Sequence, residues 1–373
     1  MKRTIEIDLQ YQNPIMGIPP QYGDPYKTAC SGDTVTIESW RNTWIKQYKE
    51  AKDYFGTFGD KSYGQLHGIN RHQPMIVCGS GPSLKNSLDA LRKNQASPHP
   101  VKVISCLHNF GYFLDEGIKA DYYLTLDAGS IVLQDVVEAR SKDPEYYWEM
   151  TKDATLIASV CTPVELFKKW KGKLYLFNTL IPDMSVRAEF EKVEKFTHYI
   201  STGGNASGGC MYAAKALMGS SDIIYVGVDL CFDYDSTFHS YKTHYDNFDG
   251  KGIGDTMPWP DVYGIRRRTW PSYFNFAQWF NFISMKVPGT WSTASEGILG
   301  AYPEGNLNSF RYGTLSDLLE KYRIADTIQL GEHEMTPEGI KPRMNEDGTA
   351  VRRDHLLSEF FKDPQQPMEI VLF

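Results

Sequence analysis

The sequence contains no long apolar run. No stretch approaches the roughly 18 apolar residues that a membrane-spanning helix needs, and the polar start Met1–Glu6 lacks the apolar core of a signal peptide. We therefore expect a cytoplasmic protein without a membrane span. The net charge of -7 gives no excess of basic residues for binding nucleic acid, so nucleic acid is not an expected partner.

Paired cysteines are also missing. The six cysteines are scattered, with no Cys-x-x-Cys motif, and most lie in apolar runs. This distribution predicts reduced thiols in the core and argues against a disulfide framework or a structural zinc site. They are Cys30, Cys78, Cys106, Cys161, Cys210 and Cys231.

The most informative stretch is Met75–Leu84, which reads Met-Ile-Val-Cys-Gly-Ser-Gly-Pro-Ser-Leu. A short apolar run breaks into a Gly-x-Gly turn, and Ser83 opens a segment whose leucines have helical spacing. Glycines let the backbone approach a ligand closely, and free amides at a helix start favour an anion such as phosphate. A tight strand-to-helix turn uses the same residues, so the motif alone leaves both interpretations open.

Further apolar runs alternate with helical patterns along the chain. Their spacing predicts a Rossmann-like α/β fold, which is a doubly wound, mostly parallel sheet with helices on both faces. We expect this nucleotide-binding domain over residues 74–330. An N-terminal arm and packing helix would precede it over 1–73, and a C-terminal tail would follow over 331–373.

The two ends of the chain differ in composition from the middle. Residues 1 to about 40 are rich in Pro, Gly and Tyr, which predicts an irregular arm. An aromatic stripe over residues 39–54 predicts a helix laid on the core. The tail is charged and contains several prolines, but it ends in the apolar residues Ile370–Phe373. We expect a homo-oligomer that forms through the arm or the tail.

Polar side chains follow the expected strands at their carboxyl ends. Asn109 lies just beyond one strand, and two others deliver Asp127 and Asp229. In open parallel sheets, ligands bind at this edge where the strand order reverses. We therefore expect these side chains and the Gly-x-Gly turn to line one crevice. Asp127 also has the simpler interpretation of capping the helix that follows it.

A second glycine-rich segment, residues 201–209, leads into an Ala-rich helix. Its small and hydroxyl residues give a second helix start rich in free amides, which suits a phosphate or a carboxylate. Two glycine-rich helix starts and two acids at strand ends would then meet at one place.

These segments together resemble the MptE-like 6-hydroxymethylpterin diphosphokinase domain family. The sequence is most similar to the branch of the bacterial motility-accessory-factor (Maf) glycosyltransferases, and the bacterial CMP-sialyltransferases show a related Gly-x-Gly-Pro-Ser-Leu turn. The resemblance covers about residues 74–320. Its most specific segments are the first, Gly79–Leu84, and the last, Ser292–Gly300. It rests on Gly79–Leu84, Leu126-Asp127, Thr202–Gly209, Val226–Leu230 with His239, and Ser292–Gly300.

The resemblance implies a nucleotide in the crevice. The His-Gly-Asp-Asn and Asp-Gly-Asp-Arg motifs of the archaeal pterin kinases in the family are absent here, which favours sugar transfer over pyrophosphoryl transfer. By position, the residues expected to bind the nucleotide are Gly79, Ser80, Gly81, Ser83, Asn109 and Asp127, and those expected at its phosphates are Thr202, Gly203, Gly204 and Asn205.

We therefore predict a nucleotide-dependent transferase, a glycosyltransferase with a CMP-type nucleotide-sugar donor and a protein or glycan acceptor. Inverting sugar transfer needs a general base for the acceptor hydroxyl and donors for the leaving phosphate. His239 and His244 follow the strand that ends at Asp229, and these three are the expected catalytic residues. Tyr241 and Glu296 are the expected substrate contacts.

Two alternatives remain open. In a Mg²⁺-dependent diphosphokinase, Asp127 and Asp229 would supply carboxylates to the metal; sugar transfer implies no firm cofactor. A catalytically inactive binding or assembly protein would keep the fold and use its aromatic arms for partners. The run Arg266–Arg268 is typical of a solvated face, although Arg also suits phosphate or acidic-sugar recognition.

Overall fold

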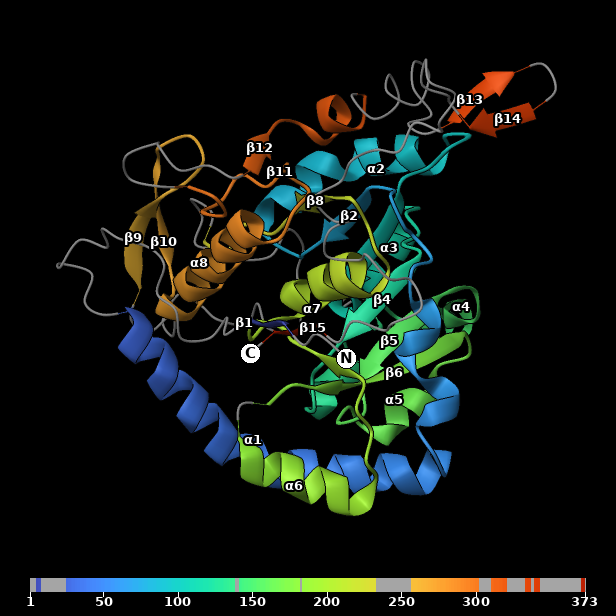
Figure 1. The fold of residues 1–373 in the computed structure, drawn as a ribbon, viewed down its shortest axis with the longest axis vertical. Helices are drawn as coiled ribbons and strands as arrows, with labels where there is room; N and C mark the ends of the chain where they lie inside the picture. Colours follow the sequence, from blue (N-terminus) through green and yellow to red (C-terminus); the bar gives the residue numbers. More distant parts are fainter. Residues whose placement is uncertain are drawn as a thin grey trace.

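One parallel sheet organises the fold. The computed structural model describes residues 5–7, 25–137, 141–181, 183–232, 256–301, 310–320, 333–336, 339–342 and 370–372. Nine strands form the sheet, in the order β12-β11-β8-β2-β3-β4-β5-β6-β7, and each neighbouring pair is parallel (Figure 1). The strands are β2 (Met75–Cys78), β3 (Lys102–Cys106), β4 (Tyr122–Thr125), β5 (Thr155–Ser159), β6 (Lys173–Thr179), β7 (Tyr199–Ile200), β8 (Asp222–Val226), β11 (Thr290–Thr293) and β12 (Phe310–Tyr312).

The strand order reverses at β2. From β2 the chain adds β3 to β7 in one direction, and it then returns to place β8, β11 and β12 on the other side of β2. Ile76 therefore lies between Val103 of β3 and Ile224 of β8. All four residues of β2 are buried, as a continuous apolar run predicts for a central parallel strand. The Rossmann-like prediction is confirmed.

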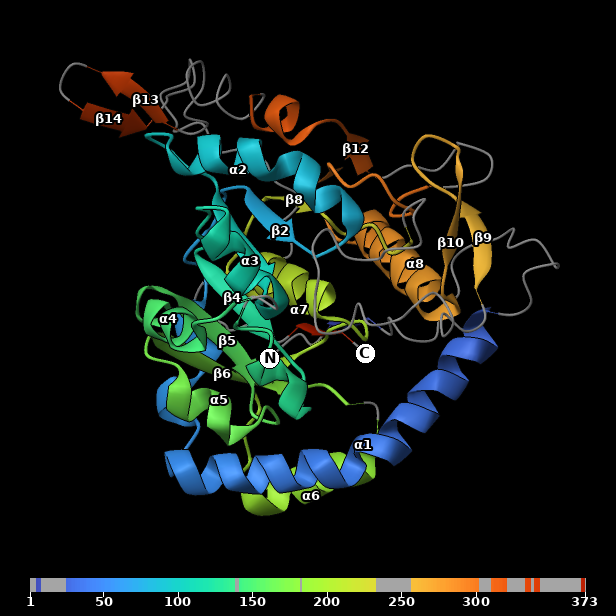
Figure 2. The same cartoon turned by 180° about the vertical axis from the view of Figure 1, so that it is seen from behind.

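Helices cover both faces of the sheet (Figures 1 and 2). Because strand side chains alternate between faces, Ile76 and Cys78 belong to one buried cluster, whereas Met75 and Val77 belong to another. The first cluster packs under α1 (Pro25–Phe55), α2 (Leu88–Gln95), α3 (Phe110–Asp115), α4 (Pro144–Met150), α5 (Val164–Lys169) and α6 (Met184–Val193). The second packs under α7 (Ala206–Tyr212) and α8 (Pro271–Lys286).

Helix α1 is longer than the sequence predicts. It begins at Pro25, not near Ser39, and it contacts α5 and α6 on one side of the molecule and α8 on the other (Figure 1). Tyr48 of the predicted stripe is fully buried and stacks on Phe190 of α6 at 4.4 Å. Trp40 of the same stripe remains 37% exposed. The irregular-arm prediction is therefore wrong from Pro25 onwards, because tertiary contact with α8 extends the helix.

Two other helices differ from the sequence-based predictions. After the Gly-x-Gly turn, a 3₁₀ helix over Pro82–Ser87 comes before α2. The sequence pattern around Val132–Arg140 also predicts a helix. Within the described residues this prediction is wrong, because a 3₁₀ helix covers Ser130–Leu133 and no helix continues to 137. Asp135 points instead to His108, with its Oδ1 atom 2.7 Å from Nδ1 of the ring.

Smaller pairings lie outside the main sheet. The hairpin of β9 (Met257–Pro260) and β10 (Arg266–Thr269) is antiparallel, as is that of β13 (His333–Thr336) and β14 (Gly339–Pro342). β1 (Ile5–Ile7) pairs in parallel with β15 (Ile370–Leu372), which brings the two ends of the chain together. No helix in the described ranges is long and apolar enough to cross a membrane.

Five of the six cysteines can be assessed. They are buried and carry free thiols, as predicted: Cys78, Cys106, Cys161, Cys210 and Cys231.

Candidate functional site

The turns that follow β2 and β8 pack directly on each other at the point where the strand order reverses. The backbone amide of Gly81 donates to the carbonyl oxygen of Gly227 at 2.7 Å. A Cβ atom on Gly79 would lie 2.5 Å from the same oxygen, which is closer than packed atoms approach. Gly227 itself has φ +62°, a conformation that L side chains rarely adopt. The glycines of the first motif therefore allow two backbone turns to meet.

Asp229 closes this junction. Its Oδ2 accepts the backbone amide of Ser83 at 2.8 Å, and its Oδ1 accepts the Ser83 hydroxyl at 2.6 Å and the backbone amide of Glu296 at 3.0 Å. The side chain is buried, which raises the pKa of its carboxyl, while the bonds from Ser83 oppose that rise. A Cβ on Gly81 would collide with Oδ2. An amide expected to face a phosphate thus binds the protein's own carboxylate.

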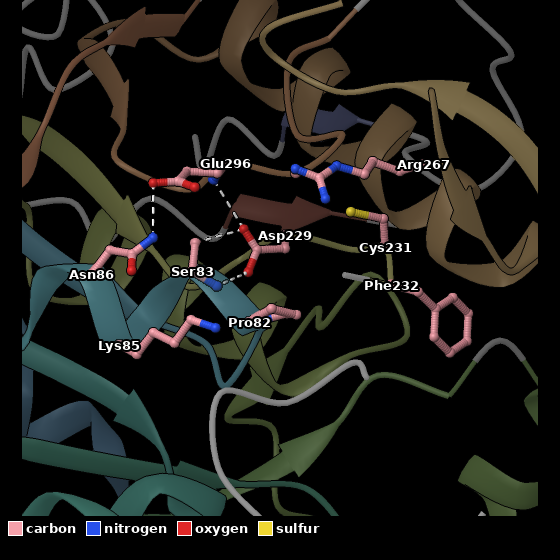
Figure 3. Close-up of a pocket in the computed structure, with 10 residues that line it drawn as sticks. Pro82, Ser83, Lys85, Asn86, Asp229, Cys231, Phe232, Arg267 and Glu296 are labelled. Carbon is pink, nitrogen blue, oxygen red and sulfur yellow. Dashed lines mark hydrogen bonds between the residues drawn. The ribbon is translucent and has the colours of Figure 1, made fainter. Parts of the chain in front are cut away.

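An open pocket lies beside this junction (Figure 3). The 3₁₀ helix contributes Lys85 and Asn86, β10 contributes Arg267, and the loop after β11 contributes Glu296. Asn86 donates to Glu296 at 2.9 Å. The lining thus combines two cations with the carboxylates of Asp229 and Glu296. Arg267 is paired with Asp261, whereas Lys85 is exposed and suits contact with a ligand that carries a phosphate or carboxylate. The lining residues are Pro82, Ser83, Lys85, Asn86, Asp229, Cys231, Phe232, Arg267, Glu296 and Gly297.

Asn109 and Asp127 hold neighbouring strand ends in place. The Asn109 amide is fully buried and donates to the carbonyl oxygen of Gly79 and to the hydroxyl of Ser105, both at 2.9 Å. Asp127 accepts the backbone amide of Gly129 at 2.7 Å, so it caps its own turn. Burial raises the pKa of Asp127, and the nearby charge of Asp135 raises it further.

The second glycine-rich segment reaches the same edge of the sheet. Asn205 caps α7 by accepting the backbone amide of Gly208 at 2.8 Å. The Ser207 hydroxyl lies 3.5 Å from the sulfur of Cys106, the last residue of β3. Asn109, which also follows β3, donates to the carbonyl oxygen of Gly79, so both glycine-rich segments lie near the carboxyl end of β3. The residues expected at the phosphates do not line the pocket described above: Thr202, Gly203, Gly204 and Asn205.

Two other residues of this segment pack against α8. Cβ atoms on Gly203 and Gly204 would meet the rings of Trp279 and Phe276, respectively. The hydroxyl of Thr202 is buried and accepts the backbone amide of Gly204 at 3.2 Å.

The two acids at strand ends do not meet. β2 and β3 separate β8, which precedes Asp229, from β4, which precedes Asp127, and this places the strand ends roughly 14 Å apart. One metal ion would not bind both carboxylates across that distance. Among the described side chains, no group of three His, Cys, Asp or Glu residues is arranged to hold a metal ion.

Three predicted site residues, His239, Tyr241 and His244, lie outside the described residues. Glu296, expected as a substrate contact, lies in the same pocket as Ser83 and Asp229. Sequence reasoning missed Lys85 and Asn86, and it did not separate Arg267 from the two arginines beside it. The signal for the first two was their position directly after the Gly-x-Gly-Pro-Ser-Leu motif.

A solved structure of the Maf glycosyltransferase from Magnetospirillum magneticum AMB-1 is 15% identical, with a TM-score of 0.49. The match covers 76% of this chain but only 42% of that protein, so this chain spans less than half of its length. No curated protein matches the chain.

A family model matches residues 44–235, which include β2 to β8, the Gly-x-Gly turn and Asp229. It confirms the family that the motifs indicate. This match covers more than half of the sequence, and the chain therefore belongs to the 6-hydroxymethylpterin diphosphokinase MptE-like family.

Proposed function

We propose that this protein is a nucleotide-dependent transferase, and that its donor is a nucleotide-sugar of the CMP type. The observation that carries the proposal is the pocket at the carboxyl ends of β2 and β8, where the turns that contain Gly79–Gly81 and Gly227 pack on each other. Ligands of open parallel sheets bind at such a reversal of strand order. Membership of a family named for a diphosphokinase supports group transfer from a nucleotide.

The charges at this edge suit a leaving phosphate. Lys85 is exposed and lines the pocket, so a phosphate there would gain a charge-assisted hydrogen bond from its ammonium group as the bond to the sugar breaks. Proton transfer from the acceptor hydroxyl would fall to His239 or His244. Asp229 would act as a positioning residue, because its three hydrogen bonds already fix the turn of Ser83 and the backbone of Glu296.

Pyrophosphoryl transfer is the second candidate, and it follows from the family. It requires Mg²⁺ at the phosphates of ATP. The separation of Asp127 from Asp229 by two strands disfavours the shared metal site that this reaction would need. The absence of the two pterin-kinase motifs from the sequence also favours sugar transfer.

A thermal-shift panel separates these functions. The purified chain is heated with CMP, UDP, ATP or 6-hydroxymethylpterin, each with and without Mg²⁺. A ligand at about 100 times its Kd stabilises the fold by about 2.7 kcal/mol, which raises Tm by several degrees. We expect CMP to raise Tm equally with and without Mg²⁺. A shift only with ATP, Mg²⁺ and the pterin would select the diphosphokinase, and no shift at all would select a binding or assembly protein.

One substitution links the shift to the pocket. Lys85→Ala should reduce the CMP shift by at least half, because it removes a charge at the opening. Lys93→Ala is the matched control, since Lys93 is exposed on the neighbouring helix α2 and does not line the pocket. Equal CMP shifts in the two variants would place the nucleotide elsewhere on the chain.

A further inference from the structure

A tryptophan of α1 lies beside a carboxylate at the carboxyl end of β4. The side chain of Trp40 is 37% exposed. Its Cη2 atom and Oδ1 of Asp127 would each lie 3.2 Å from a Cβ atom on Gly129, so the indole ring and the carboxylate flank the same turn. Ligands of open parallel sheets bind at this edge. Helix α1 thus brings an aromatic surface to a place where a ligand is expected.

The carboxylate of Asp127 has capacity for a ligand. Its Oδ1 accepts the backbone amide of Gly129 at 2.7 Å, and a carboxylate offers about four acceptor sites on its two oxygens. The side chain is half-buried. An acid in this position of a doubly wound sheet accepts a ribose hydroxyl in many nucleotide-binding proteins, and an exposed aromatic ring is a platform on which a nucleobase stacks.

The charges around Asp127 disfavour a phosphate there. Burial raises the pKa of the Asp127 carboxyl, the charge of Asp135 raises it further, and His108 opposes both. Asp135 is itself held by His108, with 2.7 Å between Oδ1 and Nδ1. Two carboxylates near one strand end repel an anionic group. The exposed ammonium group of Lys85, in contrast, lines the pocket that follows β2.

We propose that Trp40 and Asp127 hold the nucleoside of the donor, with the base stacked on the indole ring and a ribose hydroxyl donating to the carboxylate. The inference rests on the proposed nucleotide-sugar donor, and it sets the direction of that donor along the sheet, with the nucleoside at β4 and the phosphate at Lys85. Only β3 separates β4 from β2, so the two strand ends lie roughly 10 Å apart. One nucleotide and a lysine side chain together bridge that span.

A separate acceptor sugar is the rival occupant, because a sugar ring also fits an indole beside a carboxylate. The nucleoside is favoured because Trp40 and Asp127 lie one nucleotide away from the cation proposed for the phosphate. Trp40 also precedes residues 44–235, which match the family model. Its contact with the turn of Gly129 is therefore a feature of this chain that the family match does not assign.

Ligand-observed NMR titrations of the full-length protein with CMP and cytidine test the direction of the donor. Trp40→Ala should raise the Kd of both ligands at least about fivefold, because both carry the base, and Trp40→Phe should weaken them less, because it keeps a ring. Lys85→Ala should raise the Kd of CMP and change that of cytidine less than about twofold, since cytidine has no phosphate.

Tyr54→Ala is the matched control for the tryptophan. Tyr54 is a 47% exposed aromatic residue of the same helix, roughly 20 Å further along its axis. Its substitution should change both Kd values less than about twofold.

The nucleotide 2′,3′-dideoxy-CMP tests Asp127. The wild-type protein should bind it about tenfold more weakly than CMP, because it lacks the hydroxyls that would donate to the carboxylate. In Asp127→Ala the two nucleotides should have Kd values within about twofold of each other. Each comparison is made within one variant, so an effect of the substitution on stability cancels.

The outcomes separate this inference from the proposed function. CMP binding that depends on Lys85 but is unchanged in Trp40→Ala would overturn the inference and leave the transferase proposal standing. A preference for CMP over its dideoxy form that persists in Asp127→Ala would do the same. Equal loss of cytidine and CMP binding in Lys85→Ala would contradict the direction of the donor. Failure of the wild-type protein to bind CMP would overturn both proposals.

Discussion

Ser83 donates both its backbone amide and its hydroxyl to the carboxylate of Asp229, at 2.8 and 2.6 Å. The two residues are far apart in sequence and follow adjacent strands, β2 and β8, at the reversal of the sheet. These bonds occupy the backbone amide of Ser83. A phosphate bound at the start of the 3₁₀ helix would need the same amide as a donor. The Gly-x-Gly-Pro-Ser motif therefore holds two turns together as a brace, and the candidate pocket lies beside it.

Asp229→Asn tests the brace. An asparagine in the same position would turn its NH2 group toward either the amide of Ser83 or the donors at Oδ1, so that a buried donor faces a donor. We expect the free energy of unfolding to fall by about 1–3 kcal/mol, measured by urea denaturation at pH 7. Asp53→Asn on the exposed face of α1 is the control and should change it by less than about 0.5 kcal/mol.

The outcome also discriminates between two roles for the turn. If Asp229→Asn leaves stability unchanged but abolishes the CMP shift, the amide of Ser83 serves the ligand and the brace interpretation is wrong.

Gly81→Ala tests the close approach of the two turns. Gly81 has φ -64° and ψ 167°, a conformation that alanine adopts without strain, so only the collision of its Cβ with Oδ2 of Asp229 would matter. We expect a loss of about 1–3 kcal/mol in unfolding free energy. Gly59→Ala is the matched substitution, because the nearest atom to its added Cβ would be 3.8 Å away. Similar stabilities for the two variants would contradict the packing argument.

Much of the sheet was predictable from local sequence. The strands β2, β3 and β8 are short apolar runs with glycine or polar residues at their ends, and burial on both faces makes such runs easy to recognise. Helices were harder to predict where their limits depend on distant contacts. Residues 134–137 carry a helical pattern, but Asp135 binds His108, which follows β3, and no single-sequence pattern records that pairing.

The candidate site was predictable in position but not in detail. A glycine can be required because a phosphate approaches the backbone or because a neighbouring carbonyl group does. The sequence does not distinguish the two cases, since both leave no room for a Cβ atom. The sequence therefore located the turn at Gly79 and Gly81 without revealing that Gly227 fills the space. Arg267 could not be separated from its two neighbours, since only the fold shows that Asp261 lies on its side of the hairpin.

The arginine run yields a prediction with internal controls. Arg267→Met would leave Asp261 as a buried carboxylate without its ion-pair partner. We expect the free energy of unfolding, measured by urea denaturation at pH 7, to fall by about 3–5 kcal/mol. Arg266→Met and Arg268→Met remove the same charge from exposed positions, and each should change stability by less than about 0.5 kcal/mol. A comparable loss of unfolding free energy in all three variants would show that the ion pair of Arg267 with Asp261 does not stabilise the hairpin.

The buried side chain of Lys215 predicts a pH dependence of the unfolding free energy, and a substitution at this position isolates it. Its ammonium group is buried and donates to the carbonyl oxygen of Ser221 at 2.6 Å. Burial lowers its pKa from 10.5 to about 8, against the opposing charge of Asp222. Below pH 8 the lysine is charged in both the folded and the unfolded chain, so the cost of burying the charge is fully present.

Between pH 8 and 10.5 the folded chain releases this proton first, so stability should rise with pH relative to Lys215→Met. The difference between wild type and variant should grow by up to about 3 kcal/mol across that range, measured by urea denaturation at half-unit pH intervals. Subtracting the variant cancels the tyrosines and cysteines that titrate in the same window. Lys49→Met, at an exposed position on α1, should give a flat difference, and a flat difference for Lys215→Met as well would show that the buried ammonium keeps its ordinary pKa.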